Sequence, residues 1–324
     1  MFNRCIRKRK GKTGVSWWGA FSYVRRLLPL FVWLENVSTL RGDNLADVLS
    51  LLRMIGYIVV HFVLDHCHHG VPGHRNRLWI IAKFAPLASI ADQEFAQMQA
   101  SQLELALRQD PEPLSAFLDP AEDDMHAPQK RRQAPRAKAK SKSKCKAKAK
   151  AKVLAYKAKH DAVWGGERPA ELPALFEGVK DFLTDRELDV ALYDYVMRED
   201  EYEEGCTRFL DVSQSIDRCP RFNDMLPTIT PAGRFLMINT SGEEARPVRL
   251  VRAFECMRTQ GFDGRTMLSD EQYQHMDAYC QKTLQNMAGN AFSGFHIAAV
   301  ALLSLVLFDI PTTVSELEEL RAEA

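Results

Sequence analysis

Three apolar runs and one helical pattern constrain the fold of this chain more than any other feature. Residues 30–34 form a short continuous apolar run, and residues 57–64 and 78–82 are rich in β-branched, aromatic and aliphatic side chains. Between the first two runs, apolar residues recur at helical spacing through 45–55, and Gly56 follows as a C-terminal stop. A strand, a helix and a strand in this order predict a parallel βαβ unit, and therefore an α/β fold.

The rest of the chain divides by composition. Residues 1–25 open with a basic cluster and show no periodic pattern, whereas residues 90–109 predict a helix. Residues 110–165 turn to proline, acidic residues and then Ala-Lys alternation, which leaves no apolar stripe to pack and predicts a mobile insert. Order is expected to resume near residue 172. The later elements that we expect are a strand at 233–238 and helices at 185–197, 251–259, 270–287 and 293–308.

Charge is strongly segregated along a chain whose net charge is only +1. Residues 130–159 contain 14 of the 43 Lys and Arg residues and no Asp or Glu, so the remaining 29 basic residues face 42 acidic ones. A basic tract within an acidic body is typical of a segment that contacts a polyanion, or of an address signal. Non-specific phosphate contact is the binding role it predicts, and nuclear localisation is the compartment it predicts.

The seven cysteines are scattered and never occur in Cys-x-x-Cys spacing. Together with an N-terminus that lacks the pattern of a signal peptide, they predict a reducing, intracellular compartment. The longest apolar run, residues 297–307, is about half the ~20 residues that a membrane span needs. It predicts a buried helix and no membrane partner.

Three short segments carry residues suited to chemistry, and they occur in a fixed order. The first is residues 31–37, Phe-Val-Trp-Leu-Glu-Asn-Val, and the second is residues 70–80, Gly-Val-Pro-Gly-His-Arg-Asn-Arg-Leu-Trp-Ile. The third is residues 255–262, Glu-Cys-Met-Arg-Thr-Gln-Gly-Phe, which Gly289-Asn290 follows. A strand ending in Glu-Asn-Val, then Gly-Val-Pro-x-x-Arg-x-Arg, Gln-Gly-Phe and Gly-Asn resembles the later part of the DNA cytosine-5 methyltransferase family. The resemblance covers residues 28–82 and about 226–308; the segment between them falls where that family carries its variable target-recognition region.

The resemblance implies specific roles for four residues. In the family a cysteine thiolate adds to carbon 6 of cytosine, and the ring then attacks a methyl group at carbon 5. Glu35 would protonate ring N3 and stabilise that adduct, and Asn36 would fix the turn around it. Arg77 would hold the exocyclic oxygen of the flipped base, while Arg75 would brace the site or a phosphate. Taken alone, each of these residues could instead be a solvated strand end or a surface charge.

The resemblance also implies a methyl donor. S-adenosyl-L-methionine is the donor in the family, and by resemblance Gly289 would allow close approach to its amino-acid end while Asn290 hydrogen-bonds it. A plain interhelix turn is the alternative reading of Gly289-Asn290. Gln260-Gly261-Phe262 reads as a helix C-cap with a core aromatic residue.

The chain also departs from the family pattern. The Phe-x-Gly-x-Gly donor loop does not occur before Glu35, and Cys5 lacks the Pro-Cys-Gln context of the family nucleophile. Gly73 stands where the family usually carries Gln. We therefore expect a truncated or inactive member with an α/β, truncated Rossmann-like parallel sheet, a variable recognition region and a C-terminal helical return. The expected segments are a basic N-terminal segment (1–25), a partial catalytic core (26–90), a recognition-like region (91–225) with the insert, the second part of the core (226–310) and an acidic tail (311–324).

Two other readings of the sequence remain. The chain could be a non-catalytic nucleic-acid binder that uses the basic tract, or an enzyme that methylates cytosine in RNA rather than DNA. The run His66-Cys67-His68-His69 invites a zinc site. Because adjacent residues cannot all reach one metal and no second Cys/His pair lies at finger spacing, we expect no metal.

Overall fold

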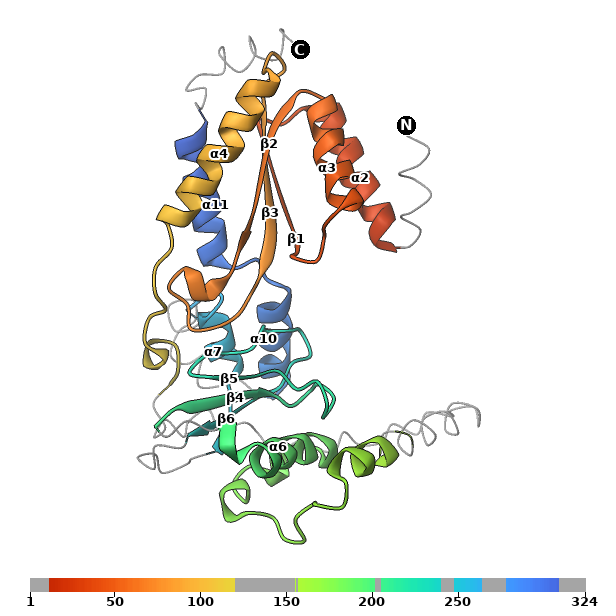
Figure 1. Ribbon diagram of the computed structural model, residues 1–324, viewed down its shortest axis with the longest axis vertical. Coiled ribbons are helices and arrows are strands. Elements are labelled where there is room, and N and C mark those ends of the chain that lie inside the picture. Colours follow the sequence, from red (N-terminus) through yellow and green to blue (C-terminus); the bar gives the residue numbers. More distant parts are fainter. Residues whose placement is uncertain are drawn as a thin grey trace. The chain divides into compact units, whose positions relative to one another are not determined.

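A computed structural model describes residues 12–119, 155, 157–201, 205–239, 248–263 and 278–308. The chain forms two compact units. Unit 1 comprises residues 1–70, 75–110 and 295–324, and unit 2 comprises residues 71–74 and 111–294. Each unit is built around its own sheet (Figure 1).

Unit 1 contains a three-stranded sheet in the order β1-β3-β2. The strands are β1 (Phe31–Val37), β2 (Tyr57–Leu64) and β3 (Arg77–Phe84), and the helix α3 (Asp43–Met54) connects β1 to β2. The predicted strands, helix and α/β class are therefore confirmed. The predicted parallel sheet needs a correction: β1 and β2 run in the same direction, but β3 lies between them and pairs antiparallel with both.

Helices cover both faces of this sheet (Figure 1). On one face, α3 buries Val48, Leu49 and Leu52 in an apolar cluster with alternate residues of the three strands. The helix α2 (Lys12–Leu27) contributes to the same cluster; the sequence analysis missed it because residues 1–25 showed no apolar period. On the other face lie α4 (Ile90–Ala106) and α11 (Gly294–Leu307), which pack against the remaining strand residues.

Two glutamines of α4 satisfy the backbone along the β2 edge of the sheet. The side-chain amide of Gln93 accepts from Val59 N at 2.8 Å and donates to Val59 O at 2.6 Å. Gln97, one helical turn further on, makes the same pair of bonds to His61 at 3.0 and 2.9 Å. Because residues i and i+4 of a helix and i and i+2 of a strand have similar spacings, the two glutamines act as a pseudo-strand.

The predicted helix near 293–308 is confirmed as α11, and it returns to the sheet of unit 1 as expected. It is only half-buried: Val300, Leu303 and Ser304 are buried, whereas Leu302 and Leu305 are exposed. By length and composition alone, the stretch Lys282–Leu307 passes as a membrane-span candidate, with a mean hydropathy of 1.8 and 28% of it buried. It comprises two helices broken at residues 291–293, so its composition is weak support for a span.

Unit 2 contains a four-stranded antiparallel sheet in the order β5-β4-β6-β7. Its strands are β4 (Thr207–Asp211), β5 (Arg221–Asn223), β6 (Phe235–Asn239) and β7 (Val248–Leu250). The helix α6 (Asp185–Met197) packs on one face, and α7 (Ala253–Arg258) and α10 (Ala278–Asn290) pack on the other. Single 3-10 turns occur in both units at His66–His68, Leu114–Ala116, Ala174–Phe176, Lys180–Phe182 and Glu199–Glu201.

The sequence predicted α6, α7, α10 and β6 near their observed positions, whereas it gave no expectation for β4, β5 and β7. The expected mobile insert at 110–165 also extends too far at its end. His160 and Trp164 are buried, and Trp164 belongs to the core that includes Phe176 and Val190. Most of the Lys-rich tract lies outside the described residues.

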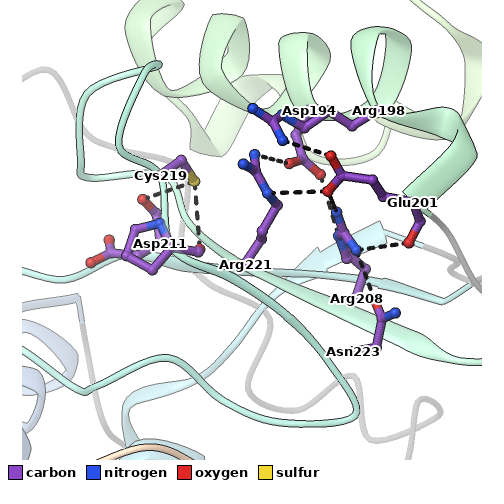
Figure 2. A network of polar contacts seen from close by, with 9 residues as sticks. Asp194, Arg198, Glu201, Arg208, Asp211, Cys219, Arg221 and Asn223 are labelled. Carbon is purple, nitrogen blue, oxygen red and sulfur yellow. Dashed lines mark hydrogen bonds and ion pairs between the residues drawn. The ribbon is translucent and has the colours of Figure 1, made fainter.

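A charge network fixes α6 to the sheet of unit 2 (Figure 2). Asp194 of α6 is almost fully buried and pairs with Arg208 of β4 at 3.5 Å and with Arg221 of β5 at 3.1 Å. Both arginines also contact Glu201, which is partly exposed. Because a buried carboxylate is stable only when paired, this network ties the helix to two strands.

Candidate functional site

Glu35 and Arg77 form an ion pair in unit 1. Arg77 Nε lies 2.9 Å from Glu35 Oε1, and the two side chains are only 17% and 19% exposed. The register places Val37 opposite Arg77 and Trp79 opposite Glu35. Side chains alternate along a strand, so Glu35, Val37 and Arg77 share one face. The sheet register therefore brings together the two residues on which the sequence prediction most depended.

The Arg77 guanidinium makes two contacts with its own unit. Its Nε contacts Glu35, and its Nη1 donates to Asn76 O at 2.9 Å. Within the described part of the chain, Nη2 makes no further hydrogen bond or ion pair. Asn36 is exposed, and its Oδ1 accepts from Val37 N at 2.8 Å. It thus satisfies the outward backbone N–H at the end of β1.

Arg75 lies behind this pair rather than on the surface. It is 4% exposed, and its backbone N–H donates to Asp65 Oδ1 at 2.8 Å. Burial and the nearby Arg77 lower the pKa of Arg75 to about 10, while Glu35 opposes that shift. A buried guanidinium close to Arg77 and Glu35 suits the bracing role that the sequence predicted, and it is poorly placed to meet a phosphate in solvent.

A cluster of buried histidines lies close to the arginines, and sequence reasoning missed it. The rings of His66 and His296 meet edge to face at 4.6 Å between centroids, and those of His69 and His296 do so at 6.1 Å. Burial lowers the pKa of His296 to about 3, with His69, Arg75 and Arg77 adding to the shift and Asp65 opposing it. Burial likewise holds the pKa of His66 well below its usual value. Both imidazoles are therefore neutral at physiological pH.

The two predicted donor-side residues belong to unit 2. A Cβ on Gly289 would lie 2.1 Å from Pro231 N and 2.3 Å from Thr230 C. The close approach at Gly289 is therefore between α10 and the backbone of this chain. Asn290 ends α10 and donates from Nδ2 to Asn286 O at 2.9 Å. The donor-binding role that the resemblance implies for Gly289 and Asn290 therefore stays a prediction.

The thiols with shifted pKa values are all poor nucleophiles. Burial raises the pKa of Cys67 to about 11 and that of Cys219 to about 12. Burial also raises the pKa of Cys256, which is fully buried beside Glu255. A thiolate is the reactive form, so none of these three suits addition to a ring. Cys5 lies outside the described residues.

The third motif supplies a structural hub instead of a reactive group. Glu255 is fully buried and accepts from Arg249 Nη1 and Nη2 at 2.9 and 2.8 Å. It also accepts from the backbone N–H groups of Arg252 at 2.6 Å and Asp119 at 2.9 Å. Gln260 O accepts from Gly294 N at 2.7 Å, and Gly261 has a positive φ of 82°, which matches the expected C-cap.

Gly73, the position that departs from the family pattern, lies against Leu226. A Cβ at Gly73 would lie 3.3 Å from Leu226 O, so a larger side chain there would crowd the backbone. The neighbouring His74 N donates to Leu226 O, and Leu226 N donates to Pro72 O, both at 2.9 Å. Within unit 2 this bridge, rather than a side chain at position 73, holds the second motif.

The sequence of residues 7–301 matches the sequence model of the C-5 cytosine-specific DNA methylase family. The match covers far more than half of the chain. The chain belongs to the C-5 cytosine-specific DNA methylase family. The matched residues include the motifs at Glu35, at Arg75 and Arg77, and at residues 255–262. The family to which the chain belongs is one of cytosine C5 methyltransferases.

One curated relative is the type II methyltransferase M.Sau3AI of Staphylococcus aureus, which is 33% identical over 78 residues. That match covers 22% of this chain and only 19% of the relative. Among solved structures, Dnmt2 methyltransferase of S. pombe has 13% identity and a TM-score of 0.42, covering 89% of this chain and 72% of that chain. The methyltransferase EhMeth of Entamoeba histolytica has 11% identity and a TM-score of 0.41, covering 87% of this chain and 66% of that chain.

Proposed function

We propose that the chain binds a cytosine turned out of DNA between Glu35 and Arg77, and serves in methylation at carbon 5 with S-adenosyl-L-methionine as donor. The observation that carries the proposal is the 2.9 Å ion pair between these two side chains on one face of the sheet. Membership of the family supports the methyl-transfer class and the donor. RNA is the alternative substrate, and the test below separates the two.

The pair suits the edge of cytosine because it offers two different groups side by side. Ring N3 and the exocyclic oxygen are neighbouring acceptors on the base. A guanidinium is a permanent donor for the oxygen, and a carboxyl group that takes up a proton becomes a donor for N3. An entering base would therefore separate Arg77 from Glu35 and take one hydrogen bond from each. Arg75, which is buried nearby, would attract the Glu35 carboxylate, because the two groups carry opposite charges.

Positioning by the sheet gives this recognition its precision. Glu35 and Arg77 lie on adjacent strands whose register fixes their separation, and Asn36 closes the strand after Glu35. Groups held on strands are placed more accurately than groups on loops, which favours recognition of one base over another. Thymine carries a proton on N3, so it would meet the protonated Glu35 as a donor facing a donor.

The binding test uses fluorescence anisotropy with duplex DNA that carries one unpaired cytosine or, as the comparison, one unpaired thymine. We expect the wild-type chain to prefer cytosine, and Arg77→Ala to remove about 1–3 kcal/mol of that preference, or roughly 5–150-fold. Arg41→Ala is the matched control, since Arg41 is an exposed arginine shortly after the same strand. A wild-type chain that does not discriminate the two bases, or an Arg77→Ala chain that discriminates as well as wild type, contradicts the proposal.

Methyl transfer is tested separately with tritium-labelled S-adenosylmethionine and DNA or RNA of the same sequence. Label in DNA supports the full proposal, and label in RNA alone replaces DNA by RNA. Cytosine preference without label in either supports a second candidate, a non-catalytic cytosine-binding member of the family. The raised pKa values of Cys67, Cys219 and Cys256 make these three thiols poor candidates for the nucleophile. Binding that falls steeply with salt and ignores Arg77 would indicate phosphate contact alone.

A further inference from the structure

Arg77, the arginine of the proposed base site, lies at the end of the unit 1 sheet. It forms the last pair of β3 with both neighbouring strands, opposite Val37 of β1 and opposite Leu64 of β2. Terminal pairs of a sheet open most readily, because further pairs support them on one side only. How well Arg77 keeps its place beside Glu35 therefore depends on what holds the chain just before β3.

The register shows which backbone bond would extend this ladder. Phe84 N donates to Leu30 O, so Phe84 and every second residue before it bond to β1. The residues between them, down to Arg77, therefore bond to β2, and Arg77 forms a hydrogen-bonded pair with Leu64. Such pairs recur at every second residue. In a longer β2, Arg75 N would donate to the backbone carbonyl two residues after Leu64.

The side chain of Asp65 supplies the acceptor that β2 does not. β2 ends at Leu64, and the chain passes into the 3-10 turn at His66–His68. Arg75 N donates instead to Asp65 Oδ1 at 2.8 Å. A carboxylate oxygen thus takes the place of the next strand carbonyl and adds one bond to the ladder beyond its last residue pair. Hydrogen bonds to an ionised acceptor are stronger than those between neutral groups.

Asp65 also fixes the point at which the chain returns to unit 1. Residues 71–74 belong to unit 2, and the chain re-enters unit 1 at Arg75. Before it leaves, the backbone C=O of Asp65 accepts from His68 N at 3.1 Å and from His69 Nδ1 at 2.8 Å. One residue therefore bonds to the chain on both sides of the excursion. Arg77 follows two residues after the point of return, so its position depends on a contact inside unit 1.

The position of the Asp65 oxygen matters here, and its charge does not. Asp65 bonds to the backbone N–H of Arg75. Burial lowers the pKa of His66 and of His296, and the Asp65 charge opposes that shift. Loss of the charge would lower both pKa values further, so both imidazoles stay neutral at neutral pH. An asparagine, which keeps an oxygen acceptor at the same place, should therefore substitute for Asp65.

We propose that Asp65 is a positioning residue for base recognition: its carboxylate oxygen holds the start of β3, so that Arg77 keeps the place at which it meets Glu35 and the base. The role in recognition rests on the proposed function, whereas the hold on β3 does not. Without the acceptor, the backbone N–H of buried Arg75 loses its bond, which favours opening of the strand end. Arg77 would then meet the base less accurately.

Hydrogen exchange of the full chain, followed by mass spectrometry, tests the hold on β3 without any ligand. We expect Asp65→Ala to speed exchange of the backbone amides of residues 75–79 by roughly 10–150-fold, the effect of losing one hydrogen bond to a charged group. Asp65→Asn should exchange much as wild type does. Asp65→Glu keeps the charge but moves the oxygen by one methylene. It should also speed exchange at 75–79, and it replaces Asp65→Ala if that variant opens all of unit 1.

Asp92→Ala is the matched control for this experiment. Asp92 Oδ2 also accepts from a backbone N–H, that of Ser89, at 2.8 Å, but at the start of α4. This variant loses a bond of the same kind and should leave exchange at 75–79 unchanged. Exchange at 75–79 that is equal in wild type and Asp65→Ala overturns the inference. So does an Asp65→Asn variant that exchanges there as fast as Asp65→Ala.

The anisotropy assay with unpaired cytosine or thymine tests the role in recognition. Asp65→Ala should lower the preference for cytosine roughly 2–12-fold, the contribution of one hydrogen bond, and Asp65→Asn should retain the preference. Added to Arg77→Ala, Asp65→Ala should change the preference no further, because its effect passes through Arg77. A further loss in the double variant as large as in Asp65→Ala alone overturns the positioning role. A wild type that does not discriminate contradicts the proposed function, and the exchange experiment then still decides whether Asp65 holds β3.

Discussion

Replacement of Glu255 by glutamine should destabilise unit 2 more than any other isosteric change of a single carboxylate that we consider. The carboxylate is fully buried and receives four hydrogen bonds, two from Arg249 and one each from the backbone N–H groups of Arg252 and Asp119. An amide keeps one oxygen, but it turns an NH₂ group toward donors and leaves the Arg249 charge without its partner. Removing one partner of a buried ion pair costs about 3–5 kcal/mol.

That cost is large compared with the ~5–15 kcal/mol that stabilises an ordinary domain. With a urea m-value of about 1–3 kcal/mol/M, the transition that unfolds unit 2 should move to lower urea by roughly 1–5 M. Urea unfolding followed by far-UV circular dichroism and tryptophan fluorescence measures this shift, with buried Trp164 as a reporter in unit 2. A second transition from unit 1 should be unaffected.

Glu201→Gln is the matched control for this experiment. Glu201 also contacts arginines, namely Arg198, Arg208 and Arg221, but its side chain is 42% exposed. Ion pairs in contact with solvent contribute about 0–1 kcal/mol, so Glu201→Gln should shift the transition little. If Glu255→Gln changes the free energy of unfolding by less than ~1 kcal/mol, well below the expected cost, or by no more than Glu201→Gln does, the hub role of Glu255 is refuted.

Two further predictions concern pH and packing. Burial lowers the pKa of His296 in the folded chain from 6.5 to about 3. Above pH 6.5 the imidazole is therefore neutral in both the folded and the unfolded chain. Between pH 6.5 and about 3, only the unfolded chain binds the proton. Stability should therefore fall in that window by up to about 1.4 kcal/mol per pH unit, and urea midpoints from pH 7 to 4.5 should decline less steeply in His296→Asn. Gly289→Ala should lower the melting temperature, because the new Cβ would lie 2.1 Å from Pro231 N. Gly19→Ala in α2 is the control and should raise the melting temperature or leave it unchanged, because a Cβ there meets nothing within 4 Å. A Gly289→Ala variant that is more stable than wild type would contradict the close approach.

Local patterns in the sequence were sufficient to predict most of unit 1. The helix near 45–55 and the strands at 57–64 and 78–82 follow from hydrophobic period and flanking glycine, and they appear as α3, β2 and β3. The order of the strands in the sheet could not be predicted. The hydrophobic period and the length of a segment do not indicate which strand lies between two others. The insertion of β3 between β1 and β2 depends on pairing between residues that are far apart in the sequence.

The candidate site was predictable only as far as short motifs reach. Glu35, Arg75 and Arg77 were found because they occur in recognisable sequence motifs, at residues 31–37 and 70–80. His296 could not be found in this way, since it lies about 230 residues after His66 and becomes its neighbour only when α11 returns to the sheet. Nothing in the predicted helix at 90–109 singled out Gln93 and Gln97, and only the structure shows that they bond to the β2 backbone.

In the proposed function, recognition of the base depends on contacts inside unit 1. Register between β1 and β3 sets the distance from Glu35 to Arg77, and Arg75 is anchored to Asp65 of the same unit. Gly289 and Asn290, by contrast, are fixed by contacts inside unit 2. Changes at Gly289 or Asn290 should therefore leave intact the Glu35–Arg77 pair, on which the proposed recognition of cytosine depends. Loss of the Glu35–Arg77 pair should remove the proposed base recognition whether or not the donor binds. Arg77→Ala is therefore a more stringent test of the proposed function than a change at Gly289 or Asn290.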